Sequence, residues 1–489
     1  MAHATKDGVD SSSRAFRSTR VVTPSGVRPA TILIRGEHIE AVTEWDSIPP
    51  GARLHDYGDL VLLPGLVDSH VHINQASPEL ATEPNRTNWE GFATATRAAA
   101  AGGVTTLVDM PLNCVHETIS VAALEAKRAA AAGQSYVDWM TWGGAVGNNG
   151  IDGNESDLTA LIAAGVPGFK CFLIHSGIDG FAWIDEPQLR KTLAALQGSG
   201  LPLLAHAELA GPVERATAAI NATAEPGNWN LYPTYLASRP EEAELEAIEL
   251  LIALAQEFDA HIHIVHLATA RALPMLKQAR KSGVRITVET CPQYLWFAAE
   301  EIPTGATEYK CAPPIRSAAN REALWQGLLD GIIDLVATDH SPCPPAMKRR
   351  DTGRFDQAWG GIASLGLALP VIRTGLKQRS ISDPEALTLI TKWLSTEPAR
   401  LAGITGQKGA LQTNNDADIV VFDPDSAWTV TEQDLHFRHK LSPYLGAQLH
   451  GRVRETWLRG RQIYPHAAQN EILRQAEPEP QGYELRRTL

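Results

Sequence analysis

Two histidines, His70 and His72, stand one residue apart in a segment whose composition favours a buried β-strand. The segment follows Pro64 and the apolar run 60–63, and from Gly65 it reads Gly-Leu-Val-Asp-Ser-His-Val-His. Because side chains alternate between the faces of a strand, both imidazoles point the same way and can bind one metal ion. Pairs of this kind serve in packing or hydrogen bonding as often as in metal binding, so a metal site needs further ligands.

Four later residues have side chains that suit the same site, and each stands near the end of a short apolar segment. They are Lys170, His206, His266 and Asp339. Singly, each has an ordinary explanation, such as an ion-paired lysine, a histidine satisfied in the core or an aspartate that caps a helix. Five segments that all carry a ligand-type residue at the matching end are much less expected by chance. The set predicts a metal-dependent hydrolase.

Three of these positions need comment. An ammonium group has no acceptor, so Lys170 can bind metal only if carbon dioxide converts it to a carbamate, whose two oxygens can bridge two metals. His261, His263 and His266 share one predicted strand; His266 is nearer its C-terminal end and lies on the other face, so His263 is expected to pack or support a ligand. A metal beside Asp339 offsets the cost of burying it and lets it act as general base and acid.

The chain from residue 64 to 404 alternates strand and helix patterns, which predicts an α/β fold with a parallel sheet. Amphipathic helices are predicted at 187–197 and 241–258. Eight βα units favour a (β/α)8 TIM barrel over an open doubly wound sheet, and TIM barrels place their chemistry at the C-terminal strand ends. The eight strand candidates are 66–73, 104–110, 136–142, 168–173, 201–208, 261–268, 284–291 and 334–340.

Both ends of the chain differ from the middle in their sequence pattern, which consists of short segments of alternating apolar and polar residues separated by turn residues. Residues 15–63 and 405–465 are therefore expected to form one small β-domain together. Residues 1–14 are rich in serine and charge, which is typical of disorder, and the polar tail 466–489 is expected to be loosely held.

Composition limits the partners and the compartment. A formal net charge of -13 argues against nucleic acid or an anionic membrane surface as the main partner. No apolar run approaches the roughly 20 residues of a membrane span. The 5 scattered cysteines and the polar start without a secretory signal indicate a reducing, cytoplasmic location. The final tripeptide Arg487-Thr488-Leu489 is a distant match to a peroxisomal address, which stays an alternative.

Several further segments form a specific set. They are Asp-Met-Pro-Leu-Asn at 109–113, Gly-Phe-Lys-Cys-Phe at 168–172, Glu-Thr-Cys-Pro-Gln-Tyr at 289–294, Lys-Cys-Ala-Pro-Pro-Ile-Arg at 310–316, Asp-His-Ser-Pro-Cys-Pro-Pro at 339–345, Ala-Trp-Gly-Gly at 358–361 and His-Lys-Leu-Ser-Pro-Tyr at 439–444. With them the chain resembles the cyclic amidohydrolases, namely allantoinases, dihydropyrimidinases (hydantoinases) and dihydroorotases, and it is most similar to allantoinases.

The resemblance implies a (β/α)8 barrel, a β-sandwich built from both ends and a homotetramer. It implies two divalent metals, usually zinc, that activate a water to open a cyclic amide, which for allantoin gives allantoate in purine degradation. It places His70, His72 and Asp339 on one metal and His206 and His266 on the other, and it makes N6-carboxylated Lys170 the bridge. Asp339 would be the catalytic base and acid.

The resemblance also suggests substrate contacts from Asn74, Arg86 and the backbone of Ala312. Asn74 stands where dihydroorotases carry an arginine for the substrate carboxylate, and no tyrosine follows Lys170 as it does in dihydropyrimidinases. Relatives run directly into Glu-Pro-Gly-Arg, whereas residues 75–82 intervene here before Glu-Pro-Asn-Arg at 83–86. A hydantoinase or dihydropyrimidinase activity is the alternative, followed by a non-catalytic scaffold that would have lost metal ligands.

Overall fold

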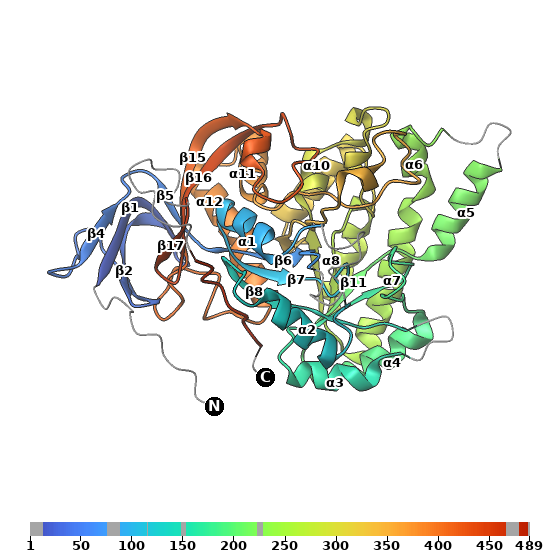
Figure 1. Ribbon diagram of the computed structural model, residues 1–489, viewed down its shortest axis with the longest axis horizontal. Helices are drawn as coiled ribbons and strands as arrows, with labels where there is room; N and C mark the ends of the chain where they lie inside the picture. The colour runs from blue at the N-terminus through green and yellow to red at the C-terminus, as the bar shows by residue number, and fades with distance from the viewer. Residues whose placement is uncertain are drawn as a thin grey trace.

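Strands from both ends of the chain share one eight-stranded sheet in the computed structural model, which describes residues 13–75, 89–114, 116–147, 153–222, 228–465 and 479–487. The order is β17-β16-β15-β5-β1-β2-β3, with β4 beside β1. Figure 1 shows the blue N-terminal strands next to the red strands near the C-terminus. The strands are β1 (Arg14–Thr23), β2 (Gly26–Arg35), β3 (His38–Thr43), β4 (Arg53–Asp56), β5 (Val61–Pro64), β15 (Ile419–Thr429), β16 (Gln448–Leu458) and β17 (Arg461–Tyr464).

The middle of the chain forms two parallel sheets. One has the order β6-β7-β8 and the other β14-β13-β12-β11-β10-β9. Every predicted strand contains one of these elements, so the prediction of an α/β fold with parallel strands is confirmed. The strands are β6 (Leu66–Val71), β7 (Val104–Asp109), β8 (Asp138–Thr141), β9 (Gly143–Gly144), β10 (Phe169–Phe172), β11 (Leu203–His206), β12 (Ile262–Ile264), β13 (Ile286–Thr290) and β14 (Leu335–Val336).

Contacts join the first and last of these parallel strands. A parallel bridge links Val71 at the end of β6 to His340, which follows β14, and the backbone N–H of His72 donates to the oxygen of His340 at 2.8 Å. The carboxylate of Asp68 on β6 accepts bonds from the backbone N–H and the hydroxyl of Thr338, at 3.1 and 2.6 Å. These bonds bring the His-x-His pair beside Asp339.

Helices follow most of the parallel strands. The helices predicted at 187–197 and 241–258 are α4 and α7, and the Asp185 side chain caps α4 by accepting the N–H of Gln188. Among the described residues, no helix has both the length and the apolar character that crossing a bilayer demands. The helices are α1 (Phe92–Ala101), α2 (Val121–Ala131), α3 (Glu155–Ala163), α4 (Glu186–Leu196), α5 (Ala210–Asn221), α6 (Tyr232–Ser238), α7 (Glu241–Phe258), α8 (Leu273–Lys281), α9 (Pro292–Trp296), α10 (Ala318–Leu329), α11 (Ala368–Gln378), α12 (Asp383–Thr391) and α13 (Glu397–Leu401).

The two terminal segments differ from expectation where they are described. Residues 1–12 of the expected disordered start lie outside the described residues, and Arg14 already belongs to β1. Residues 479–487 of the tail are bound to β8: Trp139 N–H donates to Tyr483 O at 3.1 Å, and Leu485 N–H donates to Trp139 O at 2.8 Å. For residues 479–487 the expectation of a loose tail was wrong: their backbone pairs with β8, Leu485 is buried, and Glu484 pairs with Arg128.

A buried group of charges joins β8 to the loop before β15. The Lys408 ammonium lies 2.7 Å from Asp138, 2.8 Å from Asp416 and 2.8 Å from Asp418. Arg459 also pairs with Asp138. Because these groups are withdrawn from water, their mutual pairing is what makes their burial tolerable.

Candidate metal centre and substrate pocket

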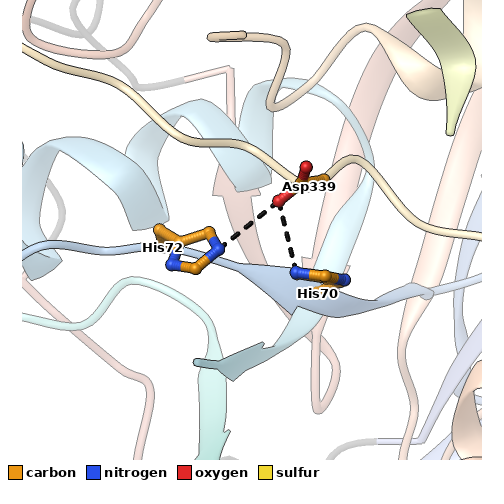
Figure 2. Close-up of side chains that lie close together, drawn as sticks. All are labelled: His70, His72 and Asp339. Carbon is orange, nitrogen blue, oxygen red and sulfur yellow. Dashed lines mark ion pairs between the residues drawn. The ribbon is translucent and has the colours of Figure 1, made fainter. Parts of the chain in front are cut away.

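His70, His72 and Asp339 meet in a buried group, which Figure 2 shows. His70 lies on β6, His72 follows the last residue of that strand, and Asp339 follows β14. The Nε2 atoms of His70 and His72 lie 3.2 and 3.4 Å from Oδ1 of Asp339. One ligand atom from each residue lies within 4.8 Å of the other two. The three side chains can therefore bind one cation.

His206 and His266 form a second close pair. His206 ends β11, and His266 follows β12 with a left-handed backbone, φ 40°. Nδ1 of His206 and Nε2 of His266 lie 3.1 Å apart, and the ring centres of His70 and His266 lie 5.5 Å apart. Burial lowers the pKa of His266 well below its usual value, and His206 and Lys170 add to the effect. A neutral imidazole keeps the lone pair that a metal needs.

Lys170 lies on β10 and is fully buried. Among the described residues, its Nζ has no hydrogen-bond partner, and it stands 5.0 Å from the centre of the Phe172 ring. Burial lowers the pKa of Lys170 to about 8, although Glu289 and Asp339 oppose the shift. A lysine that readily loses its proton offers the free amine that reacts with carbon dioxide.

All six residues and Ala312 line one cavity of about 350 Å³. Its other charged lining residues are Arg239 and Lys310. Imidazole nitrogens and a carboxylate are ligands that divalent transition metals accept. Two buried polar atoms, Nζ of Lys170 and Nδ1 of His266, lack a partner within the described part of the chain, which calls for a further group at this place. The side chains therefore fit divalent cations next to a space for a small molecule.

Comparison with known proteins agrees with this chemistry. Residues 61–463 match the model of a family described as the Amidohydrolase family. The chain belongs to the amidohydrolase family. It is 47% identical to an allantoinase from Streptomyces avermitilis over 449 residues, which cover 92% of this chain and 94% of that protein. It is 41% identical to an allantoinase from Arabidopsis thaliana over 461 residues, 91% and 87% of the two chains.

Solved structures agree with the fold of this amidohydrolase. An L-hydantoinase (dihydropyrimidinase) from Arthrobacter aurescens superposes with a TM-score of 0.85 at 26% identity and covers 97% of this chain and 99% of that chain. A dihydropyrimidinase from Brevibacillus agri gives 0.83 at 28% identity over 97% and 99%. The chain is thus an enzyme of the cyclic amidohydrolase type.

Glu289, on β13, contacts two candidate ligands of this amidohydrolase, His70 and His266, and its role was not predicted from the sequence. Its Oε1 lies 2.5 Å from Nδ1 of His70 and accepts the backbone N–H of His266 at 3.3 Å. Its Oε2 lies 3.1 Å from Nε2 of His263. Burial would raise the pKa of Glu289, but His70 and His263 outweigh it and lower the pKa. A charged Glu289 that takes the Nδ1–H of His70 directs the Nε2 lone pair toward Asp339.

Two other carboxylates support the site in different ways. Asp68 accepts the backbone N–H of His70 at 3.3 Å and holds Thr338, so it fixes the backbone rather than a histidine ring. Glu208, which was not predicted, lies 2.7 Å from Nε2 of His206 and 2.6 Å from Arg239. The sequence feature that could have revealed Glu208 and Glu289 is that each is an acidic residue within or just after an apolar strand segment.

The expected substrate contacts have different outcomes. Ala312 lines the cavity. Arg86 lies outside the described residues. Asn74 does not line the cavity, because its side chain turns away and donates to the oxygen of Pro342 at 2.9 Å. Asn113 lines the cavity instead, with its amide 3.5 Å from Nδ1 of His72. Asn113 belongs to the segment Asp-Met-Pro-Leu-Asn at 109–113, but it was not predicted to line the cavity.

Proposed function

We propose that this amidohydrolase is an allantoinase, which hydrolyses a ring amide of allantoin to give allantoate. The observation that carries the proposal is 47% identity to an allantoinase across 92% of the chain. The cavity supports it, since about 350 Å³ suits a small cyclic amide and all six residues of the predicted ligand set line it.

The proposed metal centre holds two divalent cations, with zinc as the native ion. His70, His72 and Asp339 would hold one, His206 and His266 the other, and Lys170, N6-carboxylated, would bridge them. When bound, the cations lower the pKa of a water and polarise the amide carbonyl. Within the described residues the buried Nζ of Lys170 has no hydrogen-bond partner, which supports the bridging role, because a carbamate on this atom would bind the cations.

The protein's own residues handle the proton. Asp339 takes a proton from the attacking water and delivers it to the nitrogen of the breaking C–N bond, so one water is consumed and a carboxylate and the NH2 of a ureido group result. Glu289 and Glu208 keep His70 and His206 in their orientations during this transfer. The backbone at Ala312 would hold the ring against the cavity wall.

The proposed architecture completes this picture. Residues 64–404 would form a closed (β/α)8 barrel, which the bridge between Val71 and His340 supports. Residues 15–63 and 405–465 would form a β-sandwich domain, residues 466–489 a C-terminal tail, and four chains a homotetramer. Light scattering of the purified protein tests the assembly.

Comparing the turnover of allantoin, hydantoin, dihydrouracil and dihydroorotate tests the function. We expect allantoin to have the highest kcat/KM. A preference for hydantoin or dihydrouracil would establish the alternative, a hydantoinase or dihydropyrimidinase, which the likeness to solved enzymes of that type supports.

Replacing Lys170 tests the bridging role separately. We expect Lys170→Ala to abolish turnover and bound metal, with partial recovery when a short carboxylic acid is added. Metal analysis of both proteins reads out the site directly, and full activity with full metal content in Lys170→Ala would refute the bridge.

A further inference from the structure

Lys310 brings a positive charge to the cavity without a counterion. It follows the 3-10 turn Thr307–Tyr309 and lines the cavity with Ala312 and the ligand-type residues. Its ammonium donates to the oxygen of Ala358 at 2.6 Å and lies 5.4 Å from the centre of the Tyr235 ring. Within the described part of the chain it forms no ion pair.

The charges around Lys310 make its position costly for folding. Burial lowers the pKa of Lys310 to about 7, and Lys348 and Arg239 add to the effect, while Asp356 opposes it. A cation held near other cations and away from water destabilises a fold unless something else compensates. Side chains in such positions are frequently kept for function.

The neighbouring cations already have other partners. Arg239 lies 2.6 Å from the carboxylate of Glu208. Lys348 is buried and donates to the backbone oxygens of Trp359, at 3.0 Å, and Gly361. Lys348 therefore fastens the loop 358–361, whereas Lys310 is half-buried and can still donate into the cavity.

We propose that Lys310 is a specificity-determining residue that donates a hydrogen bond to the ureido carbonyl oxygen of allantoin. The inference rests on the proposed allantoinase function. The reacting ring amide must lie at the His and Asp cluster, and the ring is expected against Ala312, two residues after Lys310 on the same wall. Allantoin differs from hydantoin by a ureido group on the ring. The carbonyl oxygen of this ureido group is a strong neutral acceptor, and among the described residues Lys310 has no carboxylate partner that would compete with it.

Comparing allantoin with hydantoin in wild-type and Lys310→Met protein tests this contact. Hydantoin lacks the ureido group and is followed as a substrate or, where it is not turned over, as a competitive inhibitor. We expect Lys310→Met to lower kcat/KM for allantoin about 10- to 100-fold, mainly through KM, because a hydrogen bond from a charged donor is lost. Binding of hydantoin should change by less than about 3-fold.

Lys348→Met is the matched control. It removes a cation that binds the backbone oxygens of Trp359, Gly361 and Lys310, so it should loosen this cavity wall as a whole and weaken allantoin and hydantoin to the same degree. Lys310→Gln, which shortens the side chain and removes its charge, serves as the second variant if Lys310→Met does not fold, and it should show the same selective loss.

Equal losses for the two ligands in the Lys310 variants would overturn the inference, since Lys310 would then only hold the oxygen of Ala358. Equal binding of allantoin and hydantoin by the wild-type enzyme would also overturn it. These results are distinct from a failure of the proposed function, which would appear as wild-type turnover of dihydrouracil or hydantoin without turnover of allantoin.

Discussion

Replacing Glu289 by glutamine is expected to weaken zinc binding although every ligand-type residue remains. The carboxylate contacts three groups of the site: Nδ1 of His70 at 2.5 Å, Nε2 of His263 at 3.1 Å and the backbone N–H of His266 at 3.3 Å. Glu289→Gln keeps the shape of the side chain, removes its negative charge and turns one acceptor into a donor.

The size of the effect follows from these contacts. A hydrogen bond to a charged group contributes about 1.5–3 kcal/mol, and about 1.4 kcal/mol is a tenfold change in affinity. Losing the charge on the bond to His70 should therefore lower zinc affinity about 10- to 100-fold, which is the range typical for partners of metal-binding histidines. Because the volume is unchanged, the fold should remain intact.

Zinc affinity is measured by stripping the protein with a chelator and titrating zinc back against a chromophoric competitor. Glu244→Gln is the matched control, since Glu244 is equally buried but pairs with Arg316, with its Oε2 3.2 Å from Nε and 2.5 Å from Nη2. It should lower the unfolding temperature and leave zinc affinity unchanged. Wild-type zinc affinity in Glu289→Gln, or an equal loss in Glu244→Gln, would refute the reasoning.

Three further predictions concern stability. Lys408→Met should lower the free energy of unfolding by about 3–5 kcal/mol in urea titrations, because it strands three buried carboxylates; the exposed control Lys191→Met should change it by less than about 0.5 kcal/mol, and similar values would count against the ion-pair role. The folded-state pKa of Lys310, about 7, lies below its ordinary 10.5, so the unfolded chain holds more protons between these pH values and stability rises with pH across that window. From pH 7 to pH 10 the unfolding temperature of wild type should therefore rise relative to that of Lys310→Met. A difference between the two unfolding temperatures that stays constant would contradict the prediction. Ending the chain after residue 478 should lower the unfolding temperature, because it frees the N–H and C=O of Trp139, and an unchanged temperature would show that the tail adds nothing.

Eight of the nine parallel strands could be predicted because each lies in a short, mainly apolar segment with a clear boundary, whereas β9, Gly143–Gly144, has no side chains to signal it. The segment 334–340 is an example: Leu335–Val336 is the paired strand, and Ala337 and Thr338 lead from it to Asp339. Helix α7 (Glu241–Phe258) coincides with its predicted bounds, since acidic residues mark its first turn and its buried side chains recur along one face. Pairing of the C-terminal tail with β8 left no such signal, because it uses backbone groups that every residue has.

The site could be predicted in its ligand types but not in its supporting contacts. Strand alternation and position were sufficient to select His70, His72 and Asp339. Glu289 is 219 residues from His70 in the chain, so only the packing of β13 near β6 makes the two partners. Asn74 and Asn113 show the same limit: both follow a parallel strand and have a left-handed backbone, φ 55° and 64°, yet only Asn113 lines the cavity.

Backbone strain at the ligands explains why the supporting carboxylates matter. His266 and Asp339 have φ of 40° and 46°, a conformation that costs a non-glycine residue about 1–3 kcal/mol. Each strained residue is fastened by a buried carboxylate: Glu289 accepts the N–H of His266, and Asp68 accepts the N–H of Thr338, the residue before Asp339. Both carboxylates also bind His70, Glu289 through the ring and Asp68 through the backbone N–H. The turns that carry these two candidate ligands are thereby tied to the strand that carries the His-x-His pair, so the geometry of the candidate metal centre depends on Glu289 and Asp68 as well as on the ligand-type residues.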